Sequence, residues 1–286
     1  MGAYGGFGLS IPVLSLNLGF PGTVTRGGER DIHSRLVSPT TANAIPFGAG
    51  VVVLPDSAGG TLQSISDFIA AGGNFISSLF GGVAVRNTKT NLIYSTLGNI
   101  GNQTPYVGSF APGQIAGLFE RGSIAVQINN GTPVSQNNVF VRTVLNGAIP
   151  AGVVGGFEAV ADGTIGAVLT GTGNGTATAL AIGPSAQNEA YTVTFTSGTA
   201  YTLTDASANI IGYGTIVATT GKTSVFRSNF VTFTLTQGST VFVNTDHFVI
   251  TVAALKTVGL FGVVFTTGVM DGNNVAEITL KNRVAA

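Results

Sequence analysis

The chain has 286 residues and a formal net charge of zero, with 12 basic and 12 acidic side chains, or 8% of its length. Ordinary domains carry roughly 25% charged residues, and a nucleic-acid binder needs a basic surplus, so we expect no nucleic-acid partner. There is no Cys, which excludes a disulfide framework and a thiolate metal site, and no stretch has the roughly 20 unbroken apolar residues of a membrane-spanning helix.

The first 35 residues predict an extended N-terminal arm. Residues 1–25 are uncharged and rich in Gly, so they have little to bury by themselves. We expect this arm to order against a neighbouring subunit.

Charges concentrate at the end of the arm. Five of them, with His33, lie within ten positions, and a second pair is expected at the start of a strand further along the chain. Alternating signs on an extended segment suit an ion-pair network with a partner, and the alternative is a solvated loop. The residues predicted to form an interface with a partner or a neighbouring subunit are Arg26, Glu29, Arg30, Asp31, His33, Arg35, Glu120 and Arg121.

Residues 61–80 interrupt an otherwise strand-like pattern. Leu62, Ile65, Phe68 and Ile69 recur at helical spacing, and two Gly residues at 72–73 end the run. The pattern predicts a short helix packed on a sheet edge, with a partner-binding helix as the alternative.

Residues 170–253 predict a separate small β-sandwich. Thr alternates with aromatic or aliphatic residues over 191–196, 201–204, 210–217, 230–236 and 247–252. This alternation is typical of strands with one buried and one solvated face. Residues 254–286 return to the pattern of short apolar strands and turns found in the first half of the chain. The module is therefore predicted to be an insertion at the tip of a loop.

The sequence contains few residues that could catalyse a reaction or bind a metal ion or a phosphate. Neither His33 nor His247 has a carboxylate partner at a recognisable spacing, and no nucleophile or phosphate-loop motif is present. The Gly run at 171–175 is interpreted as a linker, because it lacks the strand, helix and acidic residue of a dinucleotide site. We expect no catalytic, cofactor-binding or metal residues, no cofactor and no enzymatic activity.

A series of segments resembles the structural cement proteins of tailed bacteriophages, also called head decoration proteins. The series covers about residues 20–169 and 255–286. Its segments are 30–35 (RDIHSR), 44–54 (AIPFGAGVVVL), 81–86 (GGVAVR), Tyr106 with 111–115 (APGQI), 119–126 (FERGSIAV) and 267–280 (TGVMDGNNVAEITL).

The resemblance implies an all-β, jelly-roll-like sandwich or barrel over 36–169 plus 254–286, behind an arm of residues 1–35. The 170–253 module would be a second, inserted β-sandwich that projects outward. The implied role is a homotrimer on the outer surface of the phage head that bridges copies of the major capsid protein. A tail or fibre protein that binds a host surface, for instance through residues 170–253, remains the alternative.

Overall fold

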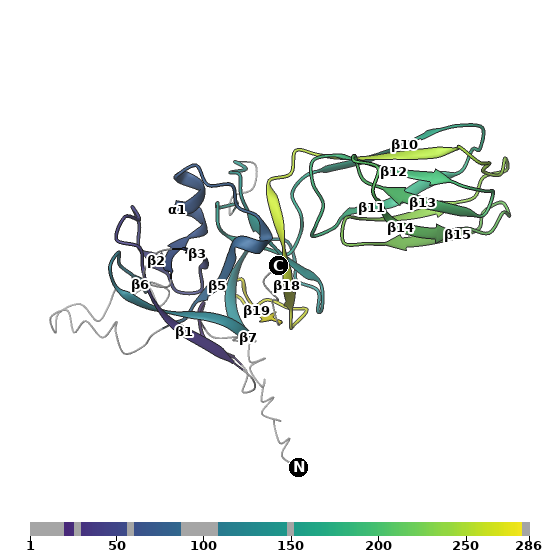
Figure 1. Cartoon of the computed structure of the whole chain (residues 1–286). Coiled ribbons are helices and arrows are strands. Elements are labelled where there is room, and N and C mark those ends of the chain that lie inside the picture. Colours follow the sequence, from purple (N-terminus) through teal and green to yellow (C-terminus); the bar gives the residue numbers. More distant parts are fainter. Residues whose placement is uncertain (1–19, 26–29, 56–59, 87–107, 148–151, 282–286) are drawn as a thin grey trace, which may run out of the picture.

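A computed structural model of the chain describes residues 20–25, 30–55, 60–86, 108–147 and 152–281, and these are nearly all β (Figure 1). The all-β class is as predicted, and the jelly-roll connectivity within it stays a prediction. Within these ranges no helix has the length and apolar character needed to cross a membrane.

The first half of the chain and its C-terminal end build one nine-stranded sheet around the long strand β7. β7 changes partners along its length: its first half pairs with β1 and β5, and its second half with β19 and β9. Because β19 pairs with β18, β18 with β8 and β8 with β9, these strands and β7 close into a ring. The strands of the sheet are β1 (Asp31–Leu36), β3 (Gly50–Leu54), β4 (Thr61–Ser64), β5 (Phe80–Ala84), β7 (Ile115–Asn130), β8 (Asn138–Arg142), β9 (Phe157–Glu158), β18 (Thr257–Phe265) and β19 (Val275–Leu280).

Two apolar clusters hold this body together. The larger one includes Ile124, Val139, Phe265 and Ile278 from the strands of the ring. A smaller one gathers beside the first half of β7, where the two-residue strands β2 (Ile45–Pro46) and β6 (Ser109–Phe110) pair. Apolar residues from distant parts of the chain therefore meet on both halves of β7.

The described parts of the predicted arm lie on this body. Gly22 N donates to Ala125 O at 2.8 Å and Ala125 N donates to Thr23 O at 2.9 Å, so residues 22–24 run beside β7. Further on, β1 is a paired strand of the sheet. Residues 1–19 and 26–29 of the arm lie outside the described residues.

The predicted helix over 61–80 is shorter than expected. Residues 61–64 form β4, and α1 (Ile65–Ala70) follows, with Ser64 Oγ accepting a hydrogen bond from Asp67 N. Gly72 ends it at a φ of +87°, as the sequence indicated. A single 3₁₀ turn, η1 (Ser77–Leu79), carries the rest of the segment back to β5.

Two further sheets form the Thr-rich module. Tyr191, Phe195, Phe233 and Phe248 point into a shared core, while the alternating Thr residues face outward. The predicted alternation is therefore observed. One sheet holds β10 (Thr164–Thr170), β17 (His247–Ala253), β12 (Ala190–Phe195), β13 (Ala200–Thr204) and β14 (Ile210–Thr215); the other holds β11 (Thr176–Ile182), β16 (Val231–Thr236) and β15 (Thr223–Arg227).

The Gly run at 171–175 is a turn inside the module and not the predicted linker. The Asp246 carboxylate accepts hydrogen bonds from Thr172 N at 2.8 Å and Gly173 N at 3.0 Å, which fixes the chain as it passes from β10 to β11. A Cβ on Gly171 would lie 2.0 Å from Asp246 Oδ1, so Gly is required there. The module's first strand, β10, lies before this turn and starts at Thr164, six residues before the expected boundary at 170.

The two connections to the module meet at a buried ion-pair cluster. Arg142 and Glu158 are both fully buried; Arg142 Nη2 donates to Glu158 Oε2 at 2.9 Å, and Nη1 to Asp162 Oδ2 at 2.7 Å. Lys256 N donates to Asp162 O at 2.8 Å, and Asp162 N to Thr257 Oγ1 at 2.9 Å. The outgoing and returning segments are thus tied to each other and, through Arg142, to β8.

The charges of this cluster support one another. Burial alone would raise the pKa of Asp162, but hydrogen bonds from Asn146 and Arg142 and the positive charges of Arg142 and Lys256 outweigh it and lower that pKa. Burial alone would likewise lower the pKa of Arg142, and its two carboxylate partners raise it instead. Arg142 and Asp162 therefore remain charged at neutral pH.

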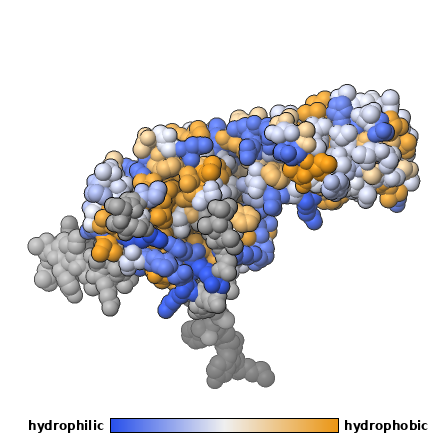
Figure 2. Space-filling view, in the orientation of Figure 1, coloured by the Kyte–Doolittle hydropathy of each residue, from blue (hydrophilic) through white to orange (hydrophobic). Residues whose placement is uncertain are grey.

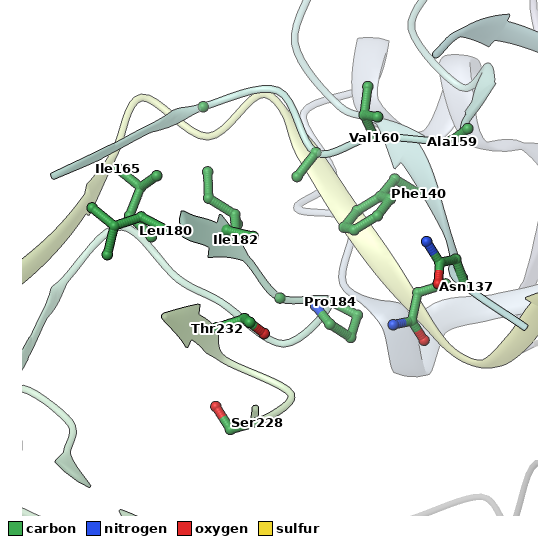
Figure 3. A pocket seen from close by; sticks show the side chains of 15 residues that line it. Asn137, Phe140, Ala159, Val160, Ile165, Leu180, Ile182, Pro184, Ser228 and Thr232 are labelled. Atoms are coloured by element: carbon green, nitrogen blue, oxygen red, sulfur yellow. The ribbon is translucent and has the colours of Figure 1, made fainter. Parts of the chain in front are cut away.

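A cavity of about 450 Å³ lies beside this junction (Figure 3). Phe140 and Val160 line it from one side, and Ile165, Leu180 and Pro184 from the module. All of its lining side chains are uncharged, so it offers no group for an ionic ligand.

Candidate interaction surface

β1 and the first half of β7 bring together the two charge groups singled out in the sequence. The strands are antiparallel, with Asp31 opposite Arg121 and Arg35 opposite Ala116. The register shifts between Asp31 and Ile32, which leaves Glu120 as an extra residue on β7. Strand alternation then places Asp31, His33, Arg35 and Glu120 on one face.

The four side chains form a contiguous charged cluster. His33 Nε2 lies 3.0 Å from Asp31 Oδ1 and 3.8 Å from Glu120 Oε2, and Arg35 Nη2 lies 3.7 Å from Glu120 Oε1. The side chains of His33 and Asp31 are about half exposed, at 49% and 54%. Figure 2 shows hydrophilic residues gathered at this end of the molecule, over β1 and the adjoining part of β7. The cluster is solvated and open to a partner.

The structure thus unites most of the predicted interface. Arg30 is exposed just before β1, and Arg121 is half-buried on β7. Arg26 and Glu29 lie outside the described residues. The expectation that Glu120 and Arg121 stand at the start of a strand was wrong, because both lie inside β7.

No carboxylate partner for His33 was predicted from the sequence, and in the structure the imidazole lies near two carboxylates. Asp31 is two residues away on the same strand face, a spacing that strand periodicity could have revealed. Glu120 is 87 positions further along the chain and reaches His33 through the β1–β7 pairing alone.

The imidazole and the two carboxylates could in principle hold a metal ion. One ligand atom from each of Asp31, His33 and Glu120 lies within 4.8 Å of the others. The Arg35 guanidinium beside Glu120 opposes this chemistry, because it already places a positive charge against the same carboxylate. The arrangement fits ion pairing with another protein surface better than cation binding.

Apolar side chains on the opposite face of the strand pair were missed by the sequence analysis. Ile32 and Leu36 on β1 are 42% and 40% exposed, and Ile115, which faces Leu36 across the pair, is 68% exposed. The sequence pattern that could have revealed this apolar face is the alternation of Ile32 and Leu36 with the charged residues of β1. Both faces of β1 are therefore open.

The sequence model of the family described as structural cement protein (E217 gp24/Pam3 gp6) matches residues 13–184, more than half of the chain. The chain belongs to this family. The matched range includes β1, the whole of β7 and the first two strands of the module. A cement protein has a structural, non-enzymatic role in the phage virion, in association with the capsid.

Other comparisons add little. No curated protein matches the chain. Two crystal structures of FlgL from Xanthomonas campestris are similar over 36% and 34% of this chain, with 20% and 22% identity and a TM-score of 0.27 each. The chain spans about a third of those proteins, 32% and 31%, and a likeness at this TM-score carries no argument about fold or function.

Proposed function

We propose that this cement protein decorates the outside of an icosahedral phage head and bridges neighbouring copies of the major capsid protein. In this proposal it acts as a homotrimer, as the family resemblance implies. The capsid contact is made by the N-terminal arm (1–35) together with the charged cluster Asp31, His33, Arg35 and Glu120.

The placement of this cluster carries the proposal. In Figure 1, β1 and the start of the described chain lie at one end of the molecule, and β10 to β15 of the Thr-rich module extend from the opposite end. A protein that meets the shell through β1 would hold the module away from it, which agrees with an outward-projecting insertion.

The surface has the properties that a bridging contact needs. Mixed charges on one face of β1 give orientation and specificity, and exposed Ile32, Leu36 and Ile115 on the other give area to bury. Each contact of this size is weak alone, and many copies engaged at once on a shell become strong through multivalency.

The module suggests a second role, contact with a host surface. Tyr213 on β14 is 73% exposed and Val225 on β15 is 55% exposed, and Ser224 Oγ donates to Thr215 O at 2.6 Å, so these two strands adjoin. An exposed aromatic ring on a rigid sheet edge is a feature of binding surfaces. Retention of purified protein by host cells, and its loss in Tyr213→Ala, would support this second role.

Charge reversal tests the capsid contact. Because β1 is part of the sheet, the exposed residues are better changed than deleted: Asp31→Lys with Glu120→Lys is expected to weaken co-sedimentation with capsids at least tenfold. Lys222→Glu with Arg227→Glu reverses two charges on exposed residues of the module and should leave binding unchanged. Equal binding by both variants would contradict the assigned surface, and no binding by the natural chain would contradict the proposed function.

A further inference from the structure

Three Asn–Gly pairs occur in the chain, at 130–131, 146–147 and 174–175. In such a pair the backbone nitrogen of Gly can attack the side-chain amide carbon of the preceding Asn, because Gly has no Cβ to hinder the approach. The side-chain nitrogen leaves as ammonia, taking the proton of the Gly N–H, and water then opens the resulting cyclic imide. Asn is thereby converted into Asp or its isomer isoaspartate, and the reaction needs neither a cofactor nor an enzyme.

The structure separates the three pairs by how tightly their Gly residue is packed. A Cβ on Gly131 would lie 2.9 Å from Val160 Cγ2. A Cβ on Gly175 would lie 2.3 Å from Phe242 Cζ. Gly147 is exposed, and a Cβ there would meet nothing within 4 Å. Formation of the imide ring needs room around the Gly residue, so the surroundings of Gly147 are the most favourable of the three.

The other two pairs are also held more firmly. Asn130 is the last residue of β7, and its carbonyl oxygen accepts a hydrogen bond from Ala159 N at 2.8 Å. The side chain of Asn174 is engaged at Oδ1, which accepts a hydrogen bond from Thr240 N at 2.8 Å. Asn146 lies beyond the end of β8, outside the helices and strands. Segments outside regular structure rearrange at a lower cost in free energy, and the attack requires such a rearrangement.

Asn146 also lies against the ion-pair cluster at the base of the module. Its Nδ2 donates to Asp162 Oδ2 at 2.8 Å, the same oxygen that accepts from Arg142 Nη1 at 2.7 Å. Burial alone would raise the pKa of Asp162, and the hydrogen bond from Asn146 is first among the interactions that lower it. This hydrogen bond engages the nitrogen that leaves in the reaction and not the carbon that is attacked. The amide of Asn146 is thus part of the network that anchors the module.

We propose that Asn146–Gly147 is a site of spontaneous deamidation, and that the carboxylate formed there loosens the anchoring of the module to the body. A carboxylate in place of the amide has no N–H to donate to Asp162, and it brings a like charge to the same place. The Arg142 guanidinium would then face this new carboxylate besides Asp162 and Glu158, with no further cation supplied. Its ion pair with Asp162 is therefore weakened.

The change reaches both connections to the module. Asp162 O accepts a hydrogen bond from Lys256 N, and Asp162 N donates to Thr257 Oγ1, so a displaced Asp162 disturbs the segments that enter and leave the module. An aged copy of the protein would hold its module less firmly than a newly made one. This inference concerns the junction and goes beyond the proposed capsid contact, on which it does not depend.

Peptide mapping by mass spectrometry tests the site. Full-length protein is incubated at mildly alkaline pH, which favours loss of the Gly N–H proton, and the deamidated fraction is followed at Asn130, Asn146 and Asn174. We expect Asn146 to react at least about tenfold faster than the other two. Gly147→Ala, for which the structure has room, should remove most of this difference. Reaction at Asn146 no faster than at Asn130 or Asn174 would overturn the assigned site.

Limited proteolysis tests the consequence. Asn146→Asp reproduces the charge that deamidation creates, and Asn146→Ala is the matched control that removes the hydrogen bond to Asp162 without adding a charge. The connections at 159–163 and 254–256 are expected to be cut several-fold faster in Asn146→Asp than in Asn146→Ala. Natural protein aged at alkaline pH should approach the Asp variant, while aged Gly147→Ala should not. Equal cutting of the Asp and Ala variants would overturn the proposed loosening.

Discussion

Asp246 shows how a single side chain fixes a turn in a module with few charges. Burial alone would raise its pKa, but hydrogen bonds from the backbone N–H groups of Val243, Thr172 and Gly173 outweigh burial, and the pKa is lowered. An Asp with a lowered pKa in the folded state stabilises the fold at pH values above the ordinary Asp pKa of about 3.9. This contribution disappears as the pH falls through the folded-state pKa.

Replacement of this carboxylate should change both the stability and its pH dependence. We expect Asp246→Asn to lower the free energy of unfolding at pH 7 by about 1–3 kcal/mol, because buried N–H groups lose a charged acceptor. The loss of stability as the pH falls below the ordinary Asp pKa of about 3.9 should also become smaller than in the natural protein. Urea unfolding at a series of pH values measures both effects, and parallel pH profiles for the two proteins would contradict the role given to Asp246.

The charged cluster on β1 marks the limit of prediction at the level of single residues. The concentration of charge around residue 30 was visible in the sequence and singled out Asp31, His33 and Arg35. The contact of these residues with Glu120 was not, because it depends on a register between strands far apart in the chain. The exposure of Ile32 and Leu36 was also hidden, since an alternating strand is expected to bury one of its faces.

Among the elements, β7 organises the body because it serves two groups of strands. It changes partners near Gly122, which has a φ of +110°, a conformation that residues with a Cβ rarely adopt. Gly at this point lets one strand of 16 residues complete both the ring and the sheet that carries β1.

Gly122→Ala should therefore destabilise the body. The expected loss is about 1–3 kcal/mol in the free energy of unfolding, the strain of an L-residue held in this backbone conformation. Gly166→Ala in β10 is the matched control, because a Cβ there meets nothing within 4 Å, and its effect should be small. Chemical denaturation of both variants makes the comparison, and equal stabilities would contradict the role of Gly122.

The strands that were predicted well are those with the most regular patterns of apolar residues. Strands β12, β13, β16 and β17 were predicted within one residue or so, because large apolar residues recur at every second position, and in the first three they alternate with Thr. β10 and β11 were missed: their apolar positions are mainly Ala, Val and Leu, and a Gly run that looked like a linker separates them. The helix was overextended because Leu62, on β4, falls by chance at helical spacing from Ile65.

At the scale of the whole molecule, the proposed contact surface lies at one end and the Thr-rich module at the other. The ion-pair cluster of Arg142, Glu158 and Asp162 ties the two connecting segments to the ring, so the module is anchored to the body by both of its ends. The low charge of the chain, 8% of its residues, fits this arrangement. Thr residues form the outward faces of the module's strands, and the ten positions with the most charges, residues 26–35, fall in the segment where we propose the contacts to form.

The number of copies bound per shell tests the central claim most directly. Purified protein would be titrated against mature capsids that lack it, and bound copies counted by quantitative gel analysis or cryo-electron microscopy. The cement proposal predicts saturation at a fixed multiple set by the icosahedral symmetry of the shell, with the module visible on the outside. Binding that does not saturate at such a number, or no binding, would contradict it.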